Sequence, residues 1–145
     1  MRLNESDLKL LKQYFATQKD VVAVYLYGSF AYGNPHKGSD LDIAVLFDGS
    51  VNLYKRLGSL YSGFPTLSIK AEPEVREIDL NQSPVFLKNV LTGKCVFSRD
   101  ESKRINFAVA AMNIYRDTEY LRNLKYHYMN QSFKEGTYGY RLFNR

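Results

Sequence analysis

The stretch that decides the fold is residues 25–47, YLYGSFAYGNPHKGSDLDIAVLF. Its pattern predicts a strand, a tight turn at Gly28 and Ser29, a loop rich in turn-forming residues, and a second strand. Two acidic residues, Asp40 and Asp42, stand where the second strand begins. Alternate residues of a strand point to the same face, so we expect both carboxylates to project together.

Two neighbouring carboxylates favour a divalent cation between them, because without one they repel each other and lose hydration. Their hard oxygen atoms suit Mg²⁺, which usually takes one or two carboxylates and completes its shell with water and nucleotide phosphates. Gly28 allows the backbone to approach a phosphate closely, and the Ser29 hydroxyl and nearby amides can donate to it. The two halves of the stretch therefore predict a single site for a metal ion and a triphosphate.

The pattern Gly-Ser, ten residues, Asp-x-Asp resembles the signature of nucleotidyltransferases of the polymerase-beta-like superfamily. More narrowly, the short chain is similar to the minimal nucleotidyltransferases, the MntA-type antitoxins encoded beside HEPN-domain toxins. The resemblance covers roughly residues 20–98. It implies an α+β fold, in which a small mixed, partly antiparallel sheet is flanked by helices and followed by a long C-terminal helix.

The resemblance also implies a third carboxylate. The segment Glu77-Ile78-Asp79-Leu80 is typical of a strand end, and in the family such a strand runs beside the Asp-x-Asp strand. This makes Asp79 the third acid, with Glu77 as the alternative if the register shifts by two residues. The expected catalytic residues, which are also the expected ligands of two Mg²⁺ ions, are Asp40, Asp42 and Asp79.

The nucleotide, expected to be ATP, is assigned to Gly28, Ser29 and Ser39, although Ser39 could equally cap the turn before the second strand. Relatives often carry a basic residue near the position of Tyr32, so the positive charge at the triphosphate must come from elsewhere. Lys37 and Arg56 are the candidates. The neighbouring His36 is best explained as an exposed loop histidine.

The function that the resemblance implies is transfer of AMP from ATP to a tyrosine hydroxyl of a HEPN ribonuclease toxin, in a hetero-oligomeric complex that neutralises the toxin. Two alternatives stay open. One is a non-catalytic antitoxin that acts by binding, and the other is a nucleotidyltransferase acting on a small molecule such as an aminoglycoside. The acceptor, the nucleotide, the number of AMP units and the stoichiometry are not fixed by the sequence.

The whole chain of 145 residues reads as one domain, 1–145, with 45% hydrophobic residues and a net charge of +5. The basic residues are spread along the chain, so direct nucleic-acid binding is possible but not expected. A single cysteine, Cys95, excludes an internal disulfide framework and is expected to be a buried strand thiol. We find no apolar run of membrane-spanning length and no signal-peptide pattern, and expect a cytoplasmic protein.

Further elements follow from periodicity and capping residues. Helices are expected after Asn4 or Ser6, over residues 51–62, from Pro84 to Leu91, and as one long helix over residues 100–130. A tail of unassigned role occupies residues 131–145. Arg122 and His127 superficially match the ribonuclease motif of HEPN domains, but that motif requires a helical bundle that a single helix does not supply.

Overall fold

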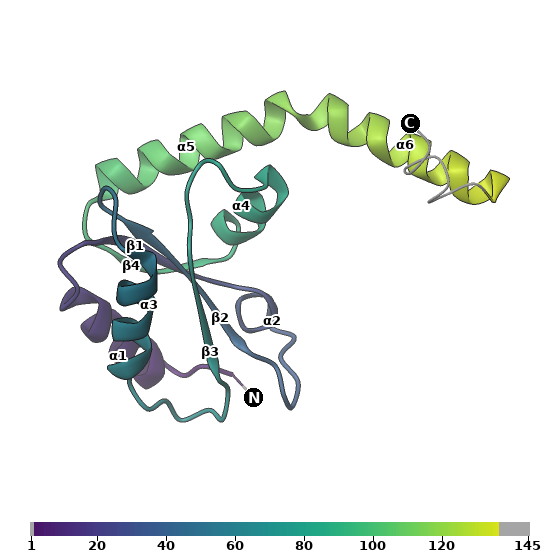
Figure 1. Cartoon of the computed structure of the whole chain (residues 1–145). Coiled ribbons are helices and arrows are strands. Elements are labelled where there is room, and N and C mark those ends of the chain that lie inside the picture. Colours follow the sequence, from purple (N-terminus) through teal and green to yellow (C-terminus); the bar gives the residue numbers. More distant parts are fainter. Residues whose placement is uncertain (1, 137–145) are drawn as a thin grey trace.

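The fold is built on one four-stranded sheet, seen in a computed structural model that describes residues 2–136. The strand order is β3-β2-β1-β4 (Figure 1). β1 runs antiparallel to both β2 and β4, whereas β2 and β3 are parallel. The expected α+β class with a mixed sheet is confirmed. The strands are β1 Val21–Tyr27, β2 Leu41–Phe47, β3 Pro73–Glu77 and β4 Lys94–Ser98.

Helices cover both faces of the sheet, which is why β1 is a nearly continuous apolar run. On one face lie α1 (Glu5–Ala16) and α3 (Leu53–Ser62), which contribute Leu11, Phe15 and Leu60 to a core with alternate residues of β1 and β2. On the other face lies α4 (Pro84–Leu91), and its Leu87 and Val90 pack with the remaining strand residues and with α5. The two cores fix β1 and β2 from both sides.

Helix starts follow the expected capping chemistry. The Asn4 side chain accepts a hydrogen bond from the Asp7 amide, and the Asp7 carboxylate accepts one from the Asn4 amide. These reciprocal bonds form a capping box at the start of α1. The Asp7 carboxylate is buried and also accepts from the Ser68 amide at 2.9 Å and from its hydroxyl at 2.6 Å. The same residue thereby ties α1 to the segment that leads into β3.

The single long C-terminal helix expected over residues 100–130 is instead two helices, α5 (Glu101–Asp117) and α6 (Glu119–Glu135). They meet at Thr118, whose backbone leaves the helical region at φ −94° and ψ 0°. The second helix also extends beyond the expected boundary at residue 130. The last part of the expected tail, residues 137–145, lies outside the described residues.

Arg122 bridges this joint. Its guanidinium donates to the Tyr115 carbonyl at 2.6 Å and lies 3.8 Å from the centroid of the Tyr115 ring. The interaction satisfies a carbonyl that the end of α5 leaves without a helical partner. Arg122 therefore has a structural explanation that is independent of any ribonuclease motif. Figure 1 shows α5 lying along the domain and α6 reaching away from it.

Cys95 differs from expectation, because it is exposed rather than buried. It lies in β4, an edge strand that pairs only with β1, and the pairing is irregular between Val24 and Tyr25, next to the cysteine. Within residues 2–136, no helix has both the length and the apolar content that crossing a bilayer requires.

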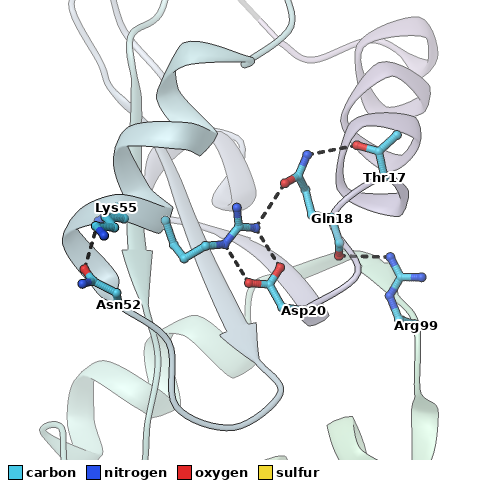
Figure 2. A network of polar contacts seen from close by, with 7 residues as sticks. Thr17, Gln18, Asp20, Asn52, Lys55 and Arg99 are labelled. Carbon is cyan, nitrogen blue, oxygen red and sulfur yellow. Dashed lines mark hydrogen bonds and ion pairs between the residues drawn. The ribbon is translucent and has the colours of Figure 1, made fainter.

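Arg99 holds the chain between α1 and β1. It donates to the carbonyls of Ala16 at 2.8 Å, Val21 at 3.0 Å and Gln18 at 3.1 Å, and Figure 2 shows the bond to Gln18. We predict that Arg99→Met lowers the free energy of unfolding by about 2 kcal/mol, because several carbonyls lose a charged donor. Urea denaturation measures this. Arg116→Met, which removes only an exposed bond to Asn113, is the control. Equal losses in the two variants would contradict the structural role of Arg99.

Candidate active site

The site begins where β1 ends. Gly28 takes φ 72° and ψ −157° and turns the chain into the short helix α2 (Ser29–Tyr32), a helical turn where the sequence indicated only a loop. A Cβ at position 28 would overlap the carboxylate of Asp42. Glycine is therefore required at position 28 for two reasons: its backbone conformation and the close approach of the Asp42 carboxylate.

Asp42 lies at the centre of the site. It is the second residue of β2, opposite Tyr27 on β1 and opposite Glu74 on β3. Burial raises the pKa of the Asp42 carboxyl, and the nearby carboxylates of Glu74 and Asp40 raise this pKa further. Asp42 is thus a crowded, half-buried acid whose negative charge is unfavourable without a cation.

Glu74 is the acidic neighbour that the sequence analysis missed. Because β2 and β3 are parallel, the start of β3 lies beside the start of β2, and Asp42 pairs with Glu74 in register. The two side chains also interact by a hydrogen bond that favours a protonated carboxyl.

The structure does not bring Asp79, the expected third carboxylate, to Asp40 and Asp42. The Ile78 amide donates to the Val45 carbonyl, so the parallel pairing continues and places Asp79 beyond the far end of β3. Five residues of extended chain separate it from Glu74, about 16 Å. Glu77, the alternative, is level with Val45 and also lies away from Asp42. The segment from Glu77 to Leu80 does follow a strand end as expected, but it lies at the end of β3 away from Asp42.

Three acids therefore gather at one end of the sheet: Asp40 just before β2, Asp42 within it and Glu74 on β3. Over the described residues, 2–136, no three His, Cys, Asp or Glu side chains are close enough together to hold one metal ion. Asp40 is exposed and its side chain lies outside the strand, whereas Asp42 and Glu74 already touch. A rotation of the Asp40 side chain would be needed to complete a three-carboxylate site.

Ser39 closes the loop that carries Asp40. Its hydroxyl accepts from the His36 amide at 2.8 Å, and its own amide donates to the His36 carbonyl at 2.9 Å. This is the turn-capping role left open by the sequence. Contact between Ser39 and a nucleotide stays a prediction, as do the nucleotide contacts of Gly28 and Ser29.

Arg56 does not reach this site. Its guanidinium forms a two-bonded ion pair with Asp20, with both nitrogen-to-oxygen distances at 2.7 Å, and donates to Gln18 at 3.1 Å. Figure 2 shows the side chains of Asp20 and Gln18, its two partners, close together. The pair lies toward the Phe47 end of β2, so Arg56 is wrong as a phosphate ligand. Lys37, exposed on the loop before Asp40, stays a candidate.

Arg76 supplies positive charge that the sequence analysis did not single out. Its Nε lies 3.8 Å from Glu74 Oε1, and its charge opposes the rise in the pKa of Asp42. The guanidinium also lies 5.4 Å from the centroid of the Phe86 ring. Tyr32, at the position where relatives often have a base, donates its hydroxyl to the Asn89 carbonyl at 2.7 Å and so joins α2 to α4.

The family model for polymerase beta and related nucleotidyltransferases matches residues 9–102, well over half of the chain. The chain belongs to this nucleotidyltransferase family. The matched region runs from α1 through the whole sheet and includes Gly28, Asp40, Asp42 and Glu74. A comparison of this nucleotidyltransferase with curated proteins found no match.

Solved structures share the fold of this nucleotidyltransferase. A chain of a toxin–antitoxin complex with AMP-PNP is 21% identical with a TM-score of 0.62, over 83% of this chain and 96% of that one. A chain of a mutant MntA-HpeT toxin–antitoxin is 25% identical, with a TM-score of 0.62 and coverage of 87% and 97%. A chain from the tri-AMPylated Shewanella oneidensis HEPN toxin in complex with MNT antitoxin is 21% identical, with a TM-score of 0.54 and coverage of 84% and 91%.

The close contact between Gly28 and Asp42 gives a matched pair of variants. We predict that Gly28→Ala weakens binding of ATP with Mg²⁺ by at least about tenfold, because the new methyl group displaces the Asp42 carboxylate. Gly33→Ala is the control, since Gly33 also has a positive φ (82°) but no atom within 4 Å of the added Cβ. Gly33→Ala should lose about 1 kcal/mol of unfolding free energy through left-handed backbone strain. Gly28→Ala should lose more, because φ 72° with ψ −157° is a combination essentially confined to glycine.

Calorimetric titration with a non-hydrolysable ATP analogue measures the affinity, and thermal unfolding measures the strain. If Gly33→Ala weakened the nucleotide as much as Gly28→Ala, the contact with Asp42 would not be the cause.

Proposed function

We propose that this nucleotidyltransferase transfers AMP from ATP to a tyrosine hydroxyl of a HEPN ribonuclease toxin and thereby neutralises the toxin. The observation that carries the proposal is the crowding of Asp42 and Glu74, with Asp40 beside them, against the Gly28 turn. Repulsion between these carboxylates destabilises the folded chain, and a bound divalent cation with a phosphate chain would offset it.

The donor set fits Mg²⁺. Asp40, Asp42 and Glu74 offer hard carboxylate oxygens, and glycine at position 28 places no Cβ in the space occupied by the Asp42 carboxylate. Glu74 replaces Asp79 in the expected set of ligands. When bound, Mg²⁺ neutralises phosphate charge and polarises the phosphoryl oxygens.

The residues of the chain act mainly by positioning. The backbone at Gly28 and the Ser29 hydroxyl hold the β and γ phosphates, so the leaving pyrophosphate stays in place. The tyrosine oxygen attacks the α-phosphorus and forms a new phosphorus–oxygen bond. The bond to the β-phosphate oxygen breaks, and the hydroxyl proton passes to a carboxylate, for which Glu74 is placed. The products are an AMP-tyrosine phosphodiester and pyrophosphate.

Structurally similar proteins support the assignment of the nucleotide and of the acceptor. One is a complex with AMP-PNP, which supports ATP as the substrate, and another contains a tri-AMPylated HEPN toxin, which supports the toxin as acceptor. AMP on a tyrosine adds negative charge and bulk, which would repel RNA phosphates from a ribonuclease site. A chain that controls an RNA-cleaving toxin would act in the cytoplasm.

A second candidate is an antitoxin that acts by binding alone. The two C-terminal helices support it, because they expose apolar and aromatic side chains of the kind enriched at protein interfaces. The exposed residues include Ile105, Val109, Met112, Tyr120, Leu121, Leu124 and Tyr126.

The double variant Asp40→Ala/Asp42→Ala separates the two candidate functions. Loss of neutralisation with the complex retained favours AMP transfer, and retained neutralisation favours binding alone.

The position of the third carboxylate gives the sharpest test of the transferase. We predict that Glu74→Gln lowers the rate of AMP transfer to a HEPN ribonuclease toxin by about a hundredfold or more, because a metal-facing charge is lost. Glu72→Gln, an exposed acid two residues earlier, should keep the wild-type rate. Mass spectrometry of the toxin over time gives the rates.

Two results would count against this account. No added AMP with the wild-type chain removes the proposed activity. A wild-type rate for Glu74→Gln, combined with a large loss of rate for Asp79→Asn, returns the third carboxylate to Asp79.

A further inference from the structure

The order of the strands fixes the side from which an acceptor approaches. Gly28 ends β1, Asp42 stands on β2 and Glu74 on β3, in that order across one end of the sheet. Pyrophosphate held at Gly28 leaves on the β1 side. In an in-line displacement the attacking oxygen enters opposite the leaving group, and so it arrives from the β3 side. This step rests on the proposed function.

A groove lies on that side. It has a volume of about 730 Å³, follows β3 between α3 and α4, and includes Glu74 in its lining. We call it the β3 groove. Its apolar walls are formed by Leu53, Leu57 and Tyr61 of α3 and by Phe86 of α4. The β3 groove therefore connects the predicted point of attack with the far end of the strand.

Acidic side chains outnumber basic ones in the β3 groove: Glu74, Glu77 and Asp79 line it, and Arg76, which lies 3.8 Å from Glu74, is the one cation among its lining residues. Among residues 2–136, neither Glu77 nor Asp79 forms an ion pair with a cation. Burial and the nearby charge of Asp79 raise the pKa of Glu77. The chain as a whole has a net charge of +5, so this acidic end is a local exception to the general charge.

The groove is unsuited to the addition of a strand. The Val75 amide, which faces the free edge of β3, already donates to the Tyr61 hydroxyl at 2.7 Å. Further along, the Gln82 side chain donates to the Glu77 carbonyl at 2.8 Å and accepts from the Asp79 amide at 3.0 Å. These contacts occupy the edge in the way a neighbouring strand would, so an occupant must be held by its side chains.

We propose that the β3 groove binds the segment of the acceptor protein that carries the modified tyrosine, and that Glu77 and Asp79 bind a lysine or arginine of that segment. The apolar walls suit aliphatic and aromatic side chains around the tyrosine, and the two carboxylates suit a cation. Glu77 and Asp79 follow Glu74 by three and five strand residues. An extended acceptor chain has the same rise, so its basic residue lies about three to five residues from the tyrosine.

The test is a steady-state measurement of AMP transfer to the HEPN ribonuclease toxin that the wild-type chain modifies. In Glu77→Gln/Asp79→Asn the KM for that protein should rise about tenfold at low salt, with kcat within about twofold of wild type. The KM for ATP should not change. The matched control is Glu5→Gln/Asp117→Asn, which removes two exposed carboxylates that do not line the groove.

Each outcome decides between the two proposals. If the wild-type chain transfers no AMP, the proposed function fails and the groove assignment fails with it. If transfer proceeds and the double variant keeps the wild-type KM for the acceptor, the groove assignment is wrong while the function stands. A rise in the KM for ATP instead would show that the groove holds the nucleotide, which also overturns the assignment.

Discussion

The parallel register of β2 and β3 is the constraint on which the site depends. It places Asp42 and Glu74 side by side at the start of two neighbouring strands, with Asp40 just outside. Gly28 allows the end of β1 to press against the same carboxylate. Packing alone gives no reason for this arrangement, because carboxylates in contact, here the half-buried Asp42 and the exposed Glu74, repel each other. In the proposed function, a divalent cation with a phosphate chain offsets that repulsion.

The rest of the domain keeps this end of the sheet rigid while leaving it open. Apolar cores on both faces hold the central strands. Polar contacts then fix the surrounding loops: Arg56 with Asp20, and Tyr32 with the Asn89 carbonyl. Arg56 and Arg122, which could have served as a phosphate ligand and a ribonuclease group, therefore have structural roles instead. The charged groups left at the site are its acids, Arg76 and the loop residue Lys37.

The sequence predicted best where the signal is local. Caps at Asn4 and Ser83, the proline that begins α4 and the turn at Gly28 all act within a few residues, and each is found as expected. The third carboxylate could not be placed in this way, because register between β2 and β3 depends on a contact across more than thirty residues of chain. The family pattern at a strand end selected Asp79, whereas the parallel pairing selects Glu74.

The break between α5 and α6 and the role of Arg56 were missed for a related reason. Helical periodicity continues through Thr118, and the joint is marked by its backbone angles and by side-chain bonds such as that from Arg122 to the Tyr115 carbonyl. Arg56 resembles a phosphate ligand in composition, but its partner Asp20 is distant in sequence and becomes visible only in the fold. Both depend on specific side-chain pairs, which residue patterns do not encode.

The central claim is that the charge on Asp42 is unfavourable in the folded chain without a cation. The direct measurement is the free energy of unfolding of wild type and Asp42→Asn against pH, in the absence of divalent ions. Because burial and the neighbouring acids raise the pKa of Asp42 in the folded state, ionisation destabilises the fold above that pKa. Asp42→Asn should therefore be more stable than wild type at pH 7, and the gain should shrink as the pH falls through the folded pKa and vanish below about pH 4. A variant that is no more stable than wild type at pH 7 would contradict the account.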